Sequence, residues 1–455
     1  MNKIAKYDVC ILGAGVAGAA IAAYLGKNNL KVAIVDRFLG ERDTIVGELL
    51  QPGGVRLLSE MGLSCFLDDL DAQKVYGYNV INDGKSCLVP YPDVNGKLHG
   101  FGFRNGKFVM NMRKYLRDLP NVDLIEGKVT SLNFDDSRIS GFTFLPKGGE
   151  KSQTIEAHLT VVSDGPSSKF RNKLSNPEVE INGHFLGIIL EDCALPYENH
   201  GHLVMGDHPP FVMYPINRKE IRVLIDFPGT TVPRINEELK NELRENFYDA
   251  MPSSLKDAFI SAVEKGRLKV MPNHRLPAKP FKVGGAVLLG DSLNMRHPLT
   301  GGGMTAAFSD VKFLGDKILS IKDITDTVIL DGHIRAFYID RHRGSQTINI
   351  LADALYKVVL NKDLRDAFFD YIEQGGRYAG EPMALLGGIS KDKSMLIKHF
   401  FAVANHGTRK KLIRAEIMSI GSSVTMLRDA VKIITPLLKS EHPDKATKFV
   451  LNTIS

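Results

Sequence analysis

The sequence has few cysteines and lacks an export signal. Four cysteines occur among 455 residues, and no two form a CxxC pair. This argues against a disulfide framework or a structural zinc site and favours a reducing compartment. The N-terminus, MNKIAKYDVC, lacks the apolar segment and cleavage site of a secretory signal, and no run of about 18 apolar residues predicts a membrane-spanning helix. We therefore expect a cytoplasmic protein.

The charge pattern gives little support for nucleic-acid binding. The formal net charge is +6, but residues 391–455 hold 12 Lys and Arg against 5 Asp and Glu, which leaves 46 against 47 for residues 1–390. The basic excess therefore belongs to the C-terminal segment alone. The sequence has neither internal repeats nor low-complexity tracts, and its length allows two or three globular domains.

A glycine motif near the N-terminus predicts a dinucleotide site. Residues 7–36 read as strand, glycine turn, alanine-rich helix and second strand. Gly13, Gly15 and Gly18 form GxGxxG, whose glycines allow a tight turn, close approach to a pyrophosphate and helix–strand packing. Asp36 ends the second strand, where a carboxylate can accept hydrogen bonds from an adenosine ribose. The alternative is a glycine-rich turn in an unrelated α/β domain.

Two later stretches repeat this pattern of an apolar strand followed by glycine and acid. They are HLTVVSDGPSSKFR at 158–171 and GDSLNMRHPLTGGGMTAAF at 290–308. In an open α/β sheet, the carboxyl ends of the strands form the ligand crevice. Either stretch alone could be a capped loop with Asp as N-cap. Alternating runs within 180–230 predict an inserted antiparallel sheet, and the pattern becomes helical from about residue 345.

Several motifs together resemble the squalene monooxygenase family, also called squalene epoxidases, among the FAD-dependent monooxygenases related to aromatic hydroxylases. Besides the two strand-end stretches, they are IVGELLQPGG (45–54), LDAQKVYGY (70–78), NILADALY (349–356) and HFFAVA (399–404). The resemblance runs from about residue 7 to about residue 405. Eukaryotic members begin with a membrane segment that this chain lacks, which is expected of a bacterial form.

The resemblance implies an α/β fold with three parts. These are a GxGxxG-type FAD-binding domain like that of aromatic hydroxylases, an inserted antiparallel β substrate domain, and a C-terminal helical region that caps the pocket and docks on membranes. The expected boundaries are 1–75, 101–175 and 273–345 for the FAD-binding domain, 76–100 and 176–272 for the substrate domain, and 346–455 for the helical region.

By the same resemblance, the FAD contacts fall at the strand ends and the turns that follow them. Leu49 stands where the family usually carries a bulkier Phe at the flavin, and Thr44 where it usually carries a basic residue. The remaining expected cofactor residues are Gly13, Gly15, Val16, Ala17, Gly18, Asp36, Arg37, Arg113, Val129, Asp291, Gly302, Gly303 and Met304.

The third stretch divides its roles. We expect Asp291 to hydrogen-bond hydroxyls of the ribityl chain or near the pyrophosphate, and the amides of residues 301–303 to face the flavin edge at a helix N-terminus. Arg296 and His297 are expected to make structural hydrogen bonds. Replacing Gly302 by Val is expected to weaken FAD binding more than folding.

The implied reaction is epoxidation of squalene or a similar linear polyene, a step of sterol and triterpene biosynthesis. Reduced FAD and O2 give a C4a-hydroperoxyflavin, and the protein must shield and aim this group. Tyr78, with Gln51 as hydrogen-bond partner, is expected to orient the alkene; the alternative is a core tyrosine. The expected pocket walls, each of which could be plain core, are Val212, Tyr214, Pro298, Leu299, Phe369, Pro382, Leu385 and His399.

Two other activities use the same features. A flavin reductase that saturates prenyl chains would share the fold and lipid access, and a non-catalytic, FAD-stabilised lipid-binding protein would share the pocket. Electrons come ultimately from NADPH, which either visits transiently or acts through a separate flavoprotein or ferredoxin-type reductase; the resemblance favours the reductase. A metal set from His200, His202, Asp207 and His208 is weighed and rejected, because the segment reads as a solvated hairpin.

The C-terminal segment carries an apolar stripe beside basic residues, with Pro436 expected to kink or end the helix. The stripe could pack on the protein's own pocket, form a coiled-coil seam or lie on a membrane surface. A lipid-soluble substrate favours peripheral membrane association. The apolar residues are Ile413, Ile417, Ile420, Val424, Leu427, Val431, Ile434 and Leu438, and the basic ones are Arg409, Lys410, Lys411, Arg414, Arg428, Lys432 and Lys439.

Overall fold

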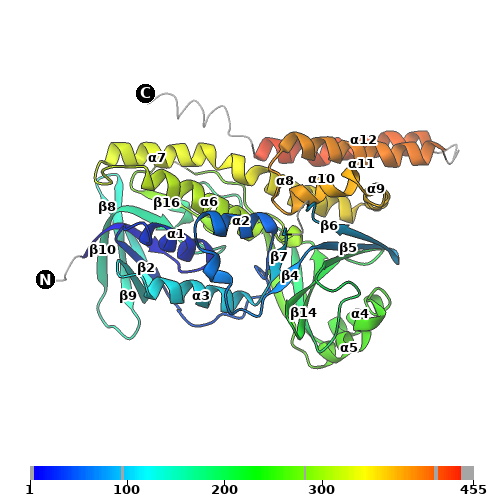
Figure 1. The fold of residues 1–455 in the computed structure, drawn as a ribbon, viewed down its shortest axis with the longest axis horizontal. Helices are drawn as coiled ribbons and strands as arrows, with labels where there is room; N and C mark the ends of the chain where they lie inside the picture. Colours follow the sequence, from blue (N-terminus) through cyan, green and yellow to red (C-terminus); the bar gives the residue numbers. More distant parts are fainter. Residues whose placement is uncertain (1–4, 94–96, 281–282, 414–418, 442–455) are drawn as a thin grey trace.

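Two large sheets and a layer of C-terminal helices organise the chain (Figure 1). The computed structural model describes residues 5–93, 97–280, 283–413 and 419–441. The first sheet comprises β1 (Ala5–Leu12), β2 (Val32–Asp36), β8 (Val122–Asp135), β9 (Arg138–Pro146), β10 (Gln153–Val162) and β16 (Ala286–Leu288). Helices α1 (Val16–Gly26), α3 (Asn105–Arg117), α6 (Gly303–Leu319) and α7 (Thr327–Asp340) pack around it.

The parallel strands of this sheet end in register. Leu12 pairs with Val35 of β2 and with Val162 of β10, and Val162 pairs with Leu288 of β16. The glycine and acid motifs that follow β1, β10 and β16 therefore meet at one edge of the sheet. This confirms the α/β fold predicted from the three strand-end motifs.

The second sheet has seven strands. In order, they are β15 (Lys269–Arg275), β11 (Glu180–Glu191), β14 (Glu220–Pro228), β13 (Phe211–Asn217), β12 (Gly201–Met205), β5 (Gly77–Asn82) and β6 (Lys85–Pro90). All neighbours are antiparallel except β12 and β5. A three-stranded sheet of β3 (Leu49–Leu50), β7 (Gly100–Gly102) and β4 (Gln73–Val75) lies between the two large ones.

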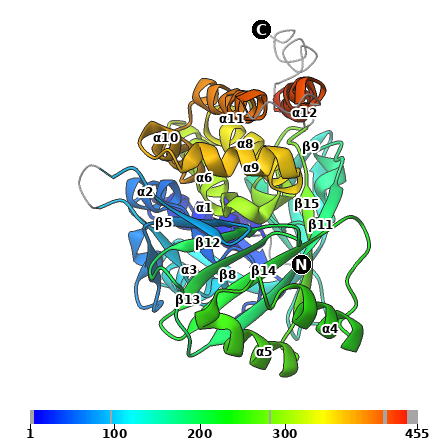
Figure 2. The same ribbon diagram turned by 90° about the vertical axis from the view of Figure 1, so that its right-hand side faces the viewer.

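Both faces of the seven-stranded sheet are covered, which explains the nearly continuous apolar runs of its strands. Side chains alternate: Leu203 and Val212 lie in one cluster, whereas their neighbours Val204 and Phe211 lie in another. Helices α4 (Glu237–Asn246) and α5 (Lys256–Glu264) cover the second face. The first face packs against the C-terminal helices (Figure 2).

The C-terminal layer contains α8 (His342–Leu360), α9 (Lys362–Ile372), α10 (Arg377–Leu386), α11 (Lys393–Ile413) and α12 (Ser419–Ser440). Pro436 lies inside α12, which continues to Ser440, so of the two expected outcomes, a kink or an end, the end of the helix at this proline is wrong. Ile434 and Leu437 are buried in a cluster with Ile350 of α8 and Leu385 of α10. Part of the expected apolar stripe therefore packs against the protein's own helices.

The remaining stripe residues divide between the surface and parts not described. Val431 is 49% exposed and Leu438 half-buried. Arg428, Lys432 and Lys439 are exposed beside Val431. Ile413, Ile417, Ile420, Val424 and Leu427, with Lys411 and Arg414, lie outside the residues whose side chains the structure describes. No helix in the described ranges combines the length and the apolar character that crossing a membrane requires.

A buried ion pair joins the first sheet's connecting segment to the second sheet. Arg222 of β14 donates to Glu48 through Nε at 2.7 Å and Nη2 at 3.1 Å, and both side chains are nearly inaccessible. Burial opposes ionisation of Arg222, but contact with Glu48 holds its pKa above the usual value. Arg222 is therefore charged, and removing the Glu48 carboxylate would leave that charge buried without its counter-ion.

We predict that Glu48→Gln lowers the free energy of unfolding by about 3 kcal/mol, because it leaves the Arg222 charge buried without a counter-ion. Denaturant titration of the apoprotein measures this loss. Glu60→Gln, which breaks the exposed Arg56–Glu60 pair, is the control and should cost less than about 0.5 kcal/mol. Equal costs for the two variants would contradict the prediction.

Candidate functional site

The first glycine turn is shaped for a phosphate group. A Cβ on Gly13, whose φ is 91°, would lie 2.4 Å from Ser163 O, and one on Gly18 would lie 1.9 Å from Gly13 O. A Cβ on Gly15 would meet no atom within 4 Å. Gly15 precedes α1, which has no side-chain cap, so the first amides of the helix face open space.

Asp36 and Arg113 hold this turn in place. The Asp36 carboxylate accepts hydrogen bonds from Ala14 N at 2.8 Å, Phe38 N at 3.0 Å and Arg42 Nη2 at 2.6 Å. Arg113 is buried and donates from Nε to Ala14 O at 2.9 Å. A ribose hydroxyl could reach Asp36 by displacing the Arg42 side chain, which is 39% exposed.

The third strand-end turn lies directly against the first. Gly290 has a φ of 66°, and a Cβ there would lie 2.7 Å from the Ala17 side chain. The adjacent Asp291 is exposed, and none of the described residues hydrogen-bonds its carboxylate. Burial by the surrounding chain nevertheless raises its pKa. Asp291 is thus an accessible carboxyl group beside the first glycine turn, and we call the open space before Gly15 and beside Asp291 the recess.

The residues after Asp291 lead to a second helix that begins without a side-chain cap. We call residues 298–303, which end at the first residue of α6, the 298–303 loop. Gly301 has a left-handed φ of 62°, and Gly302 is the N-cap of α6 without a side-chain cap. Arg296 donates to Gly303 O at 3.2 Å and to Asn294 O at 2.7 Å. The amides that open α6 are thus available to negative charge.

His297 holds the loop from behind. Its Nδ1 accepts from Leu299 N at 3.3 Å, and its ring stacks on Tyr356 of α8 with 3.7 Å between centroids. Its Nε2 lies 3.5 Å from Asp226 Oδ1. The contacts of His297 are all structural, as the sequence predicts.

The expectation for Gly302→Val is wrong in its structural premise. A Cβ on Gly302 would lie 2.7 Å from Ile348 Cγ2 of α8 and would point into the protein, away from the open side of the turn. The substitution would therefore disturb the packing of α6 on α8. Gly15, with open space before it, is the position where an added side chain would compete with a phosphate.

The remaining expected cofactor residues occupy varied surroundings. Met304, in the first turn of α6, and Leu49 are buried, and a Cβ on Gly301 would lie 3.4 Å from Leu49 Cδ2. Val129 is half-buried in β8, beyond the segment that pairs with β2, and Arg37 is exposed after β2. Thr44 donates to Asn105 Oδ1 at 3.0 Å.

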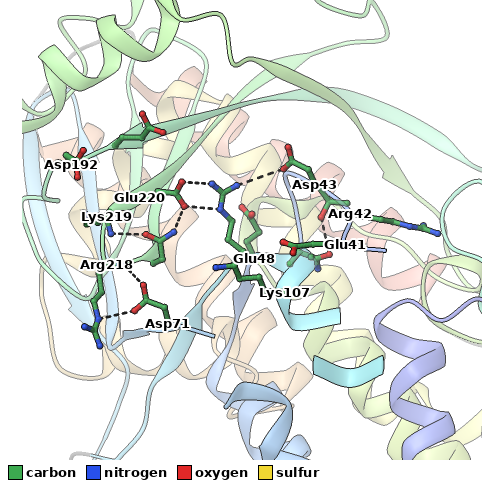
Figure 3. A pocket seen from close by; sticks show the side chains of 16 residues that line it. Glu41, Arg42, Asp43, Glu48, Asp71, Lys107, Asp192, Arg218, Lys219 and Glu220 are labelled. Carbon is green, nitrogen blue, oxygen red and sulfur yellow. Dashed lines mark hydrogen bonds and ion pairs between the residues drawn. The ribbon is translucent and has the colours of Figure 1, made fainter. Parts of the chain in front are cut away.

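Thr44 lines a polar cleft of about 780 Å³ (Figure 3). Seven acidic and five basic side chains form its walls, and several are paired, including Arg104 with Glu220 and Arg218 with Asp71. The excess of acids disfavours an anionic nucleotide, and the polar walls disfavour a hydrocarbon.

A separate, almost wholly apolar cavity lies between the seven-stranded sheet and the C-terminal helices. Of the expected residues, Tyr78, Val212, Leu299 and Pro382 line it. The lining residues that were not expected from the sequence are Val80, Val89, Leu203, Leu351, Leu355, Phe368, Ile372, Ala379, Met383 and Leu386. Leu299 belongs to the 298–303 loop, so the cavity borders the recess formed by the glycine turns.

Five expected wall residues do not line this cavity. Phe369 is buried in the same cluster as the cavity wall and Leu385 in a neighbouring one, but Phe368 and Leu386, one position away on each helix, line the cavity instead. Tyr214 and Pro298 also lie off the wall. His399 hydrogen-bonds Tyr371 through Nδ1 at 2.8 Å and Glu381 through Nε2 at 2.5 Å.

The missed wall residues carry a periodic signal. Tyr78 and Val80 are two apart on a strand, and Phe368 and Ile372 are four apart on a helix. Ala379, Met383 and Leu386 follow at spacings of four and three. Applying helical or strand periodicity to each segment could therefore have identified which of its residues face the cavity.

Tyr78 is the polar group of the cavity wall. Its ring packs over Gly201, where a Cβ would lie 2.7 Å away, and Gln51 Nε2 donates to its Oη at 2.9 Å. Burial raises the pKa of Tyr78 to about 12, although hydrogen bonding partly offsets this. The phenol is therefore protonated at neutral pH.

The histidine-rich segment is only partly the expected solvated turn: Asp207 is exposed in a bend, but residues 201–205 form a buried strand. His202 lies in β12 and is fully buried, and burial lowers its pKa to about 4. It shares a face with Val204, on the side of α4 and α5. Within the described ranges, no three His, Cys, Asp or Glu side chains gather closely enough to hold a metal.

Comparison with known proteins assigns the family. The sequence model of squalene epoxidases matches residues 156–425. A squalene epoxidase of Arabidopsis thaliana is 43% identical over 448 residues, covering 95% of this chain and 83% of the relative. That of Schizosaccharomyces pombe is 36% identical over 449 residues, covering 95% and 98%. This chain belongs to the squalene epoxidase family.

The family membership agrees with the fold. The p-nitrophenol 4-monooxygenase PnpA of Pseudomonas putida superposes with a TM-score of 0.68 at 19% identity, covering 85% of this chain and 100% of that one. The residues present fit the FAD of this fold: a glycine turn with open space before it, an unpartnered Asp291 carboxylate and two uncapped helix starts.

We predict that Gly15→Val lowers the FAD content of the purified protein at least tenfold, because its side chain fills the space before α1. Its unfolding free energy without FAD should change by less than about 1 kcal/mol, since Gly15 has an ordinary extended backbone. Gly302→Val should cost about 1–3 kcal/mol in folding through its clash with Ile348. Absorbance and denaturant titration measure the two effects; stoichiometric FAD in Gly15→Val would contradict the assignment.

Proposed function

We propose that this protein is an FAD-dependent monooxygenase that epoxidises squalene or a similar linear polyene. The observation that carries the proposal is the apolar cavity, which borders the 298–303 loop and presents one hydroxyl, that of Tyr78. Such walls suit a hydrocarbon and exclude water from the reacting groups. The relatives described above are squalene epoxidases by name.

The residues would divide the work. Bound and reduced FAD supplies the two electrons that convert one atom of O2 to water while the other enters the alkene. The glycine turns and Asp291 hold the cofactor, and the helix start at Gly303 stabilises negative charge at the flavin edge. Tyr78 orients the alkene and the oxygen it receives by donating a hydrogen bond, while Leu299 places the chain beside the flavin.

The cavity must widen to hold its substrate. Its volume is about 60 Å³, below the roughly 300–1,000 Å³ of small-molecule sites. The seven-stranded sheet is hydrogen-bonded along its length, whereas α9 and α10 contribute side chains from separate short helices. We therefore expect these helices to move outward when the polyene enters.

Alkene saturation is less well served by this cavity. A reductase must add a proton as well as a hydride, and the ionisable group on the wall is Tyr78, whose raised pKa makes it a weak acid. Mass analysis of squalene after reaction with reduced enzyme and O2 separates the alternatives. One added oxygen supports epoxidation, two added hydrogens a reductase, and unchanged lipid a binding protein.

We predict that Tyr78→Phe lowers the rate of epoxide formation about tenfold or more while FAD content stays at one per chain. The expected loss follows from removing the hydroxyl on the cavity wall. Single turnover of dithionite-reduced enzyme, mixed with O2 and squalene, measures it without a reductase. A rate within twofold of the unsubstituted enzyme would remove Tyr78 from the reaction.

We also propose that electrons reach FAD from NADPH through a separate reductase. The sequence holds one GxGxxG, and the acid-rich cleft near Thr44 is poorly suited to an anionic nucleotide. For domain organisation, we propose that 76–100 and 176–272 form the substrate domain, with the region from 346 onward, which contains most of α8 followed by α9 to α12, as its cap.

Peripheral membrane contact is proposed for the exposed face of α12. Ile434 is buried, so the apolar stripe cannot insert as a whole, but Arg428, Lys432 and Lys439 surround the exposed Val431. Each basic residue near an anionic lipid surface contributes about 1 kcal/mol. The proposed contact is therefore mainly electrostatic and supplies access to lipid-dissolved substrate.

We predict that replacing Arg428, Lys432 and Lys439 by Gln weakens binding to phosphatidylserine vesicles at least tenfold at low salt. The same number of Gln substitutions at the exposed Lys85, Lys219 and Arg234, on other elements, serves as control. Flotation measures both. Equal binding by the two triple variants would exclude α12 as the contact surface.

A further inference from the structure

Tyr91 is a buried tyrosine beside the cavity that is not part of its wall. It follows β6, and its amide donates to Tyr76 O at 2.8 Å, so its backbone is fixed to the start of β5. Its ring meets that of Tyr78 edge-on, with 6.4 Å between centroids and 89° between planes. Its hydroxyl donates to Gln51 Oε1 at 2.5 Å.

The partners of Gln51 determine which way its amide faces. Nε2 donates to Thr300 O at 2.7 Å and to Tyr78 Oη at 2.9 Å. A backbone carbonyl can only accept, so the flipped amide would bring two acceptors together at Thr300. The amide oxygen must therefore face Tyr91, and Tyr91 must be the donor there.

This arrangement fixes the position of the Tyr78 hydroxyl oxygen. Tyr78 Oη accepts from Gln51 Nε2 and lies beside the Tyr91 hydroxyl, and the Tyr78 side chain lines the cavity. Burial, followed by the neighbouring Tyr78, raises the pKa of Tyr91 well above its usual value. Both phenols therefore keep their protons at neutral pH.

We infer that Tyr91 is a positioning residue for epoxidation: it holds the Gln51 amide, which in turn directs the Tyr78 hydroxyl towards the alkene. This inference rests on the proposed function of Tyr78. Gln51 is fully buried between β3 and α2, and its amide also ties Tyr78 to Thr300 of the 298–303 loop. Loss of the Tyr91 hydroxyl leaves the buried Gln51 Oε1 without its donor, so the amide that holds Tyr78 is fixed from the Thr300 side alone.

A double-mutant cycle tests the inference. Single-turnover epoxidation by dithionite-reduced enzyme, mixed with O2 and squalene, is compared for Tyr91→Phe, Tyr78→Phe and the double variant. Tyr91→Phe should slow epoxidation roughly tenfold at saturating squalene, with FAD content and squalene affinity within twofold of the unsubstituted enzyme. Added to Tyr78→Phe, it should cause less than a further twofold loss, because its effect passes through Tyr78.

Two further variants keep the test decisive. Gln51→Met removes the next member of the hydrogen-bond series Tyr91–Gln51–Tyr78 and should slow epoxidation as much as Tyr91→Phe does. The variant that combines the two substitutions should be no slower than either single variant. Tyr371→Phe removes a buried phenol's contact with His399 and should stay within twofold of the unsubstituted rate.

The outcomes separate the inference from the proposal beneath it. Tyr78→Phe at an undiminished rate would refute the role of Tyr78 itself. Suppose that Tyr78→Phe slows epoxidation. If Tyr91→Phe then has no effect alone, or if the rate losses of the two single variants multiply in the double variant, the inference is overturned and the role of Tyr78 remains. Loss of FAD from Tyr91→Phe, together with an undiminished rate in Gln51→Met, would also overturn it.

Discussion

The parallel pairing of β10 with β1 on one side and β16 on the other is the constraint on which the site depends. These strands come from residues 5–12, 153–162 and 286–288, and only their register brings the following turns to one edge. The contact between Gly290 and Ala17 shows how tightly the first and third turns then fit. Without this pairing, Asp291 and the uncapped starts of α1 and α6 would not share a recess.

The substrate cavity is attached to that recess through very few residues. Leu299 reaches the cavity wall from the same short loop whose glycines open α6. The loop is held from two directions, by Gln51 on Thr300 O and by His297 on Leu299 N. The backbone of the loop is held by polar groups, whereas its Leu299 side chain lies among apolar ones, so under the proposed function one segment would meet both a charged cofactor and a hydrocarbon.

Much of this could be predicted from the sequence, and the failures have a common cause. Strand-end motifs report local backbone geometry, so Gly13, Gly15, Gly18 and the α/β fold could be inferred from a single chain. The direction of a side chain from a helix depends on which neighbours cover it. Leu385 is buried in a neighbouring cluster for this reason, and an added Cβ at Gly302 would meet Ile348, a residue 46 positions later.

Residues on β12 and α12 show the same limit. His202 belongs to a segment with several polar residues, but it lies in a strand that is covered on both faces. Ile434 belongs to an amphipathic stripe, but it is already buried against residues of α8 and α10. The burial of Ile434 and Leu437 against α8 and α10 also bears on how the protein can change over time. Since α8 and α10 also carry cavity residues, a change in how α12 packs reaches the cavity wall, and under the proposed membrane contact alterations in attachment and in substrate fit are expected to arise together.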